Sequence, residues 1–115
     1  AKAALDRGIP FTFHQDTPVL SPDMLGTVWC AVNRVTKGGV TLGAEQRIPA
    51  EAALRAVTVN AAHQYFEEAR RGSLRPGKAA DLVLLDTDPL AVPHEKLRDI
   101  RVLETIKAGE TVWRA

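Results

Sequence analysis

The chain has 115 residues, which is enough for one small domain. Its content of 45% hydrophobic and 25% charged residues excludes wholesale disorder. Lysine and arginine number 15 against 14 aspartate and glutamate, and this net charge of +1 gives no electrostatic case for a nucleic-acid or membrane partner.

The first elements are short. Residues 1–7 predict the end of a helix, because Gly8 and a following proline form a helix stop signal. A natural domain seldom opens by ending a helix, so we expect a piece cut from a longer protein. Aromatic and polar residues alternate over residues 11–14, which predicts a short strand. Residues 15–18 then predict a polar turn closed by proline.

A helix should follow this turn, with Ser21 as its N-cap and a proline at its first position. Its buried face is one apolar stripe at spacings of three and four: Leu25, Val28, Trp29, Val32 and Val35. The lysine and two glycines at residues 37–39 predict its end. The single cysteine, Cys30, excludes an internal disulfide and is expected to be an inert, buried thiol.

A second helix is predicted to start near residue 48 and to run through residue 62. Its expected buried stripe is Leu54, Val57, Ala61 and Tyr65. The charged residues 67–71 predict a solvated end.

The last third of the chain predicts strands. Residues 81–86 consist of four consecutive apolar residues flanked by Asp81 and Asp86, which is typical of a strand buried on both faces. Residues 93–99 predict one or two helical turns. Residues 101–107 and 111–114 predict a hairpin that turns through residues 108–110.

Asp16 is the first candidate for chemistry, because it stands just past the end of a predicted strand. A carboxylate there could ligate a metal or accept a proton from water, or it could instead cap the turn before Pro18, as aspartate does routinely. His14 lies two residues earlier and could share a metal or a hydrogen bond with Asp16, or be a partly buried histidine bonded to a backbone carbonyl. His63 and His94 have no partner at ligand spacing.

Two blocks of the sequence resemble the amidohydrolase superfamily over nearly the whole chain. The first is G-I-P-F-T-F-H-Q-D-T-P-V at residues 8–19. The second combines T-x-N-A-A at residues 58–62 with G-S-L-x-P-G-K-x-A-D-L-V-x-L-D at residues 72–86. The likeness is to the branch called amidohydrolase family three, which includes formamide deformylase-like enzymes.

This resemblance implies an α/β fold: the C-terminal part of a (β/α)8 TIM-barrel metal-dependent hydrolase, with strands of a small composite β-sandwich. Residues 1–71 would then be the last barrel strand, active-site loop and helices, and residues 72–115 the sandwich strands. A barrel takes about 250 residues, so the missing N-terminal part of the same chain is an expected partner.

The resemblance also implies the reaction. A divalent metal, most often zinc, would act in the full-length enzyme on a small-molecule amide-type substrate, with Asp16 as metal ligand and as proton acceptor and donor. His14 would lie beside this site in a supporting role. Many family members have a small or hydroxyl residue next to the aspartate, where this chain has His14 and Gln15, so the resemblance does not define what His14 does. This piece alone is expected to be inactive and to bind little or no metal.

Two alternatives stay open. Within the superfamily, the protein could instead be a cyclic amidase or a deaminase. Outside it, the same elements could form a non-catalytic α/β module for binding or oligomerisation. We expect a cytoplasmic protein that could form a homo-oligomer and that has no nucleic-acid or membrane partner.

Overall fold

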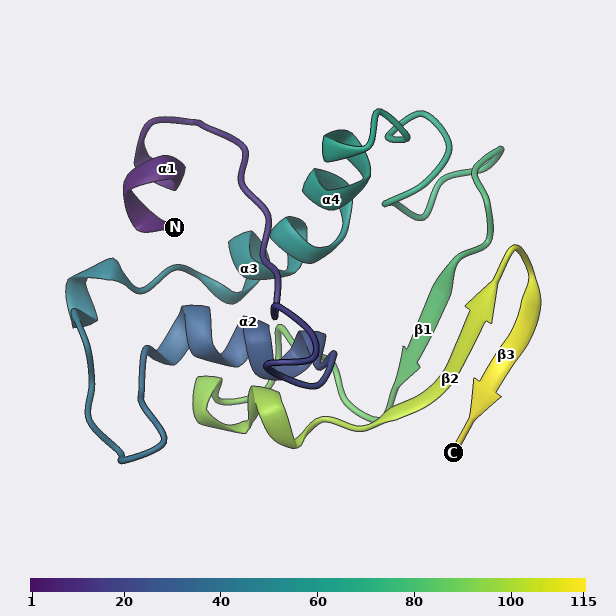
Figure 1. Cartoon of the computed structure of the whole chain (residues 1–115). Helices are drawn as coiled ribbons and strands as arrows, with labels where there is room; N and C mark the ends of the chain where they lie inside the picture. The colour runs from purple at the N-terminus through teal and green to yellow at the C-terminus, as the bar shows by residue number, and fades with distance from the viewer.

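Helices fill the first part of the chain and one antiparallel sheet fills the last part (Figure 1). The computed structural model describes residues 1–115. Its elements in chain order are α1 Lys2–Asp6, α2 Met24–Asn33, the 3-10 helix η1 Ala44–Gln46, α3 Ala50–Val57, α4 Val59–Gln64, β1 Leu82–Leu85, the 3-10 helix η2 His94–Asp99, β2 Val102–Lys107 and β3 Glu110–Arg114. None of the helices has the length and apolar character needed to cross a membrane.

Helix α1 ends where its stop signal predicted, since Gly8 takes the left-handed φ of +65°. Helix α2 begins later than predicted. Its N-cap is Asp23, whose carboxylate accepts a hydrogen bond from the Gly26 N–H at 2.9 Å, and Ser21 lies outside the helix. The helix also ends early, at Arg34 with φ +55°, and the chain folds back so that Val35 pairs with Thr41.

The core lies where α2, α3 and η2 meet. The predicted face of α2 is confirmed, because Val28 and Val32 are buried and Trp29 packs partly buried against them. Leu97 of η2 is fully buried beside them. Cys30 is exposed, so the prediction of a buried thiol is wrong: it lies about 100° around the helix from Trp29, away from the core.

The second predicted helix is two helices, because Thr58 breaks it with φ −125° and ψ −94°. The predicted buried stripe is wrong, since Tyr65 is 76% exposed and the other members are only partly buried. The buried face consists of Ala50, Ala53 and Ala56. Small side chains on this face let α3 lie close against α2, so dense packing selects alanine over larger residues.

Residues 11–14 are extended but do not form the predicted strand. None of their backbone groups makes a backbone–backbone hydrogen bond, and a strand is defined by its pairing with a neighbour. The described chain places no second strand beside them.

The sheet has the order β1-β2-β3, with both pairs antiparallel. The predicted hairpin is confirmed: Lys107 pairs with Glu110, and Ala108 and Gly109 between them both have positive φ, as a tight hairpin turn requires. The prediction that β1 is buried on both faces is wrong, since Val83 is 56% and Leu84 43% exposed. The sheet is a single layer, so its strands cannot bury both faces within these residues.

Part of the charged stretch at residues 67–71, predicted to be a solvated end, is tied into the fold, while Arg70 stays exposed. The Arg71 guanidinium lies 2.7 Å from Glu67 Oε2 and 2.7 Å from Asp81 Oδ2. The other oxygen of Asp81 accepts the Ala108 N–H at 2.9 Å. Asp81 therefore links the end of the helical part to the hairpin turn. This contact is a structural role for the first of the two aspartates in the sequence block at residues 72–86.

The same block contains a lysine and a glycine with clear structural roles. Lys78 Nζ donates to the carbonyl oxygens of Glu68 and Arg71, which closes the loop between α4 and β1. Gly72 has φ +80°, and a Cβ there would lie 2.6 Å from the Cβ of Ala62. Only glycine allows the loop to approach α4 this closely.

Candidate functional site

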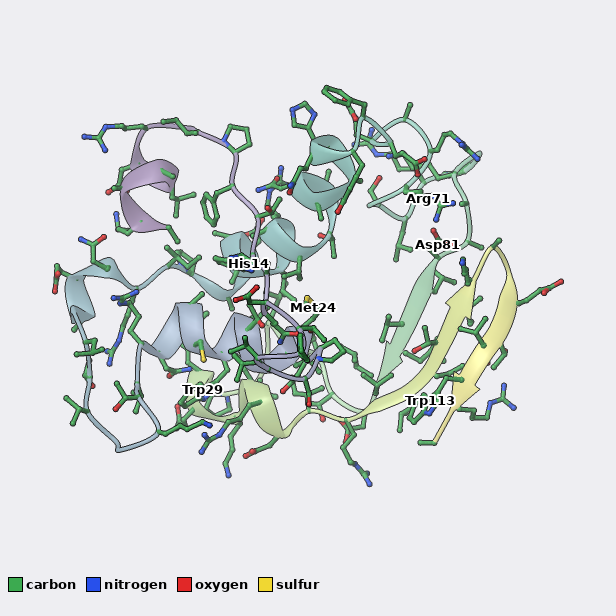
Figure 2. All side chains as sticks on the ribbon, viewed as in Figure 1. His14, Met24, Trp29, Arg71, Asp81 and Trp113 are labelled. Carbon is green, nitrogen blue, oxygen red and sulfur yellow. The ribbon has the colours of Figure 1, made fainter.

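The extended segment before Asp16 is anchored by side chains, in place of strand pairing. The Asn60 side-chain amide donates to the Phe11 carbonyl at 3.0 Å, and the Thr12 hydroxyl donates to Gln64 Oε1 at 2.6 Å. The rings of Phe11 and Phe13 lie 5.6 Å apart and pack against the core. This segment passes across the helical layer, where His14 is labelled in Figure 2.

The side chain of Gln15 is partly buried, like those of Phe11 and Phe13, and it closes the loop that follows. Its Oε1 accepts the Asp23 N–H at 2.6 Å. Its Nε2 donates to the Thr27 hydroxyl at 2.7 Å and to the Asp23 carbonyl. No motif or spacing in the sequence assigns a role to Gln15. The signal that could have found it is its position, because it falls on the same side as Phe11 and Phe13 and is polar.

Asp16 is the first residue of the closed loop and is exposed. Its φ of +54° lies in the left-handed region, which aspartate tolerates better than most residues. Its carbonyl accepts the Val19 N–H at 2.8 Å, which makes the predicted turn. Its carboxylate takes part in none of the ion pairs of the chain, so it is available to an outside group.

The three histidines of the chain lie apart from one another, as residues 14, 63 and 94 belong to different segments. His14 is exposed, and no hydrogen bond joins it to Asp16. His63 has a partner that its spacing did not predict: Nδ1 lies 3.1 Å from Glu68 Oε1. A backbone hydrogen bond at Glu68, and after it the His63 side chain, lower the pKa of the Glu68 carboxyl. His94 begins η2 and is exposed.

These residues do not by themselves form a metal site. No group of three or more histidine, cysteine, aspartate or glutamate side chains in the 115 residues is arranged to hold a metal ion. A catalytic zinc site uses three protein ligands, and the chain offers Asp16 with His14 two positions before it. The exposed carboxylate of Asp16, which has no ion-pair partner, has the chemistry of one such ligand, and no arrangement of three ligands occurs among the 115 residues.

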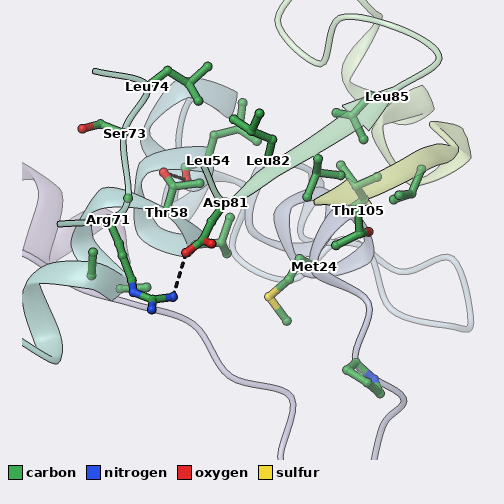
Figure 3. Close-up of a pocket in the computed structure, with 18 of the residues that line it drawn as sticks. Met24, Leu54, Thr58, Arg71, Ser73, Leu74, Asp81, Leu82, Leu85 and Thr105 are labelled. Atoms are coloured by element: carbon green, nitrogen blue, oxygen red, sulfur yellow. Dashed lines mark hydrogen bonds and ion pairs between the residues drawn. The ribbon is translucent and has the colours of Figure 1, made fainter. Parts of the chain in front are cut away.

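A large cleft lies between α3 and α4 on one side and the sheet on the other (Figure 3). Its volume is about 1370 Å³, and 12 of its 21 lining residues are hydrophobic. Leu54 and Thr58 line the helix side, Leu82 lines the sheet side, and the Arg71–Asp81 ion pair borders it. Asp16 and His14 are not among the lining residues. The cleft therefore carries no group that we assign to catalysis.

Comparison with known proteins gives one consistent result. The model of the family described as "Amidohydrolase family" matches residues 1–113. The chain is 33% identical over 108 residues to N-substituted formamide deformylase of Arthrobacter pascens, which is 94% of this chain and 20% of that protein. It is 25% identical over 115 residues to YtcJ of Bacillus subtilis (strain 168), covering 97% of this chain and 22% of YtcJ.

A solved structure agrees with these relatives. The crystal structure of an amidohydrolase from Thermotoga maritima MSB8 matches with a TM-score of 0.73 and 25% sequence identity. The match covers 96% of this chain and 24% of that structure. The chain thus spans about a fifth of the length of the curated relatives it matches.

Proposed function

The chain belongs to the amidohydrolase family, and from this premise we propose that it forms part of an enzyme that hydrolyses an amide-type C–N bond of a small molecule. The observation that carries the proposal is Asp16. Its exposed carboxylate lacks an ion-pair partner and follows an extended segment, within the residues that the family model matches. The relative named as a formamide deformylase makes N-substituted formamides the first substrates to test.

Asp16 carries the proton in this proposal. Its carboxylate accepts a proton at Oδ from the water that attacks the carbonyl carbon, and then delivers it to the nitrogen that leaves. A carboxylate suits both steps because it is a base before the attack and an acid after it. An amide at this position has no proton acceptor of comparable strength. His14, exposed two residues earlier, is proposed to orient Asp16 or the substrate from the same side of the segment.

A divalent metal, with zinc as the first candidate, supplies electrophilic activation of the carbonyl and a lower pKa of water when it is bound. Asp16 is the residue of this chain that we propose as a ligand. The remaining ligands would come from the rest of a longer protein, since the chain covers only about a fifth of its relatives. By itself the chain is proposed to be inactive.

We also propose a division of the chain at residue 71. Residues 1–71 would belong to a (β/α)8 barrel and residues 72–115 to a small β-sandwich. The cleft supports this division, because it is lined from both parts. The exposed faces of β1 and the unpaired segment at residues 11–14 would be covered by other parts of the same protein.

The proposal is tested with the longer protein that contains these residues. It is assayed against N-substituted formamides, cyclic amides and amino-substituted rings, with release of formate, ring-opened acid and ammonia as the respective readouts. We expect formamide hydrolysis that a chelator abolishes and added zinc restores, and no turnover by residues 1–115 alone. Ammonia release alone would point to a deaminase. Failure on all three classes would contradict the proposed function.

A further inference from the structure

The loop that carries Asp16 is held by its two ends. Every residue from 16 to 23 is exposed. The hydrogen bonds of residues 16–22 stay inside the loop: Val19 N–H to the Asp16 carbonyl at 2.8 Å, and the Thr17 hydroxyl to the Leu20 carbonyl at 3.0 Å. The hydrogen bonds that fix the loop to the rest of the chain are those between Gln15 and the start of α2.

We propose that Gln15 is a positioning residue, which holds Asp16 in the orientation needed for proton transfer. This inference rests on the function proposed above, in which Asp16 accepts and delivers the proton. Gln15 itself touches neither substrate nor reacting atoms in the proposal. It acts through the loop that its side chain closes.

The chemistry of the closure requires a primary amide of this length. Oε1 accepts from the Asp23 N–H at 2.6 Å, while Nε2 donates to the carbonyl of the same residue. A second Nε2 hydrogen reaches the Thr27 hydroxyl at 2.7 Å. A carboxylate can accept and cannot donate, and asparagine is one methylene shorter. The glutamine amide therefore pairs with the N–H and the carbonyl of Asp23 at once, in the way that a neighbouring strand pairs with a backbone.

The backbone at Asp16 shows why this closure matters. Its φ of +54° is uncommon for a residue with a side chain, even though aspartate adopts it more readily than most, and contacts around the loop help to hold it. Without the Gln15 bonds, the loop is free to relax at Asp16, and the carboxylate then moves relative to the substrate. A displacement of about 1 Å can lower the rate of a proton transfer about 100-fold.

The test uses the full-length enzyme and the variant Gln15→Met, which keeps the length of the side chain and removes all of its hydrogen bonds. We expect kcat to fall about 10- to 100-fold, with KM within about threefold, because binding contacts are unchanged. The Val19 amide should exchange its hydrogen faster, which reports the loop independently of turnover. The matched control is Gln46→Met, an exposed glutamine of η1, which should change neither readout.

The outcomes separate the inference from the proposed function. If Gln15→Met turns over at the wild-type rate while Asp16→Asn is inactive, the positioning role is refuted and the proposed function stands. If Asp16→Asn is fully active, the proposed function fails and the positioning role fails with it. If Gln15→Met does not fold, Gln15→Glu replaces it: that variant keeps the acceptor for the Asp23 N–H and loses both donors. A lower kcat in folded Gln15→Glu supports the inference, and an unchanged kcat overturns it.

Discussion

Truncation of Trp29 to alanine should be among the most costly single changes in the helical part. The indole packs partly buried against the core, its N–H donates to the Glu95 carbonyl at 3.0 Å, and the Arg98 guanidinium lies 4.4 Å from the ring centroid. Partial burial contributes about 2 kcal/mol, below the 3–5 kcal/mol of a fully buried tryptophan. The hydrogen bond adds about 1 kcal/mol and the cation–π contact about 0.5–1 kcal/mol. The expected loss is therefore about 3–4 kcal/mol.

Urea unfolding of the full-length enzyme, followed by far-ultraviolet circular dichroism, measures this loss. For a slope of about 1.5 kcal/mol per molar urea, the midpoint of Trp29→Ala should fall by about 2–3 M. Trp29→Phe keeps one six-membered aromatic ring and loses the N–H and the five-membered ring, so its loss should exceed the about 1 kcal/mol of the hydrogen bond and stay below that of Trp29→Ala. The exposed neighbour Cys30 provides the matched control, and Cys30→Ala should stay within about 0.5 kcal/mol of wild type. If Cys30→Ala is the more damaging change, the buried face of α2 has been assigned wrongly.

Two further changes test the loop and the sheet. Gly72→Ala should lower the free energy of unfolding by about 2 kcal/mol or more, because the new Cβ would lie 2.6 Å from the Cβ of Ala62. Gly77→Ala, which also has a positive φ but open space around it, should lower it by only about 1 kcal/mol. The difference between their urea midpoints tests this prediction. The hydrogen bond from the Arg101 side chain lowers the pKa of the Asp86 carboxyl below 3.8, so the stability that this pair adds is present above that value and is lost as pH falls through the lowered pKa. Asp86→Asn should therefore lose less stability than wild type as the pH falls below about 4, and an identical acid profile would refute the pairing.

The sequence predicted the elements whose signals are local. The hairpin at residues 101–114 follows from its turn residues, and the end of α1 follows from Gly8. The segment at residues 11–14 was not a strand, because pairing depends on a neighbour that no local pattern reveals. The face of α3 was also missed. Its bulkier residues form a regular stripe, yet the alanines are buried, since close packing against α2 depends on the partner helix.

The candidate site was only partly predictable. The position of Asp16 in an exposed turn agrees with its place after an alternating segment. The role of Gln15 could not be read from residue type, because its partners are the backbone of Asp23 and the hydroxyl of Thr27, and these contacts arise only when the loop closes. The ion pair between Arg71 and Asp81 was missed for the same reason, since a run of charges looks the same whether it is solvated or bonded.

The central claim is that Asp16 carries the proton in the hydrolysis of an amide-type bond. The most direct measurement is kcat/KM of Asp16→Asn in the full-length enzyme on its best N-substituted formamide, beside Asp99→Asn, an exposed aspartate of η2, as the control. We predict a loss of at least about 100-fold for Asp16→Asn with unchanged folding, and no loss for Asp99→Asn. Turnover by Asp16→Asn at the wild-type rate would contradict the claim.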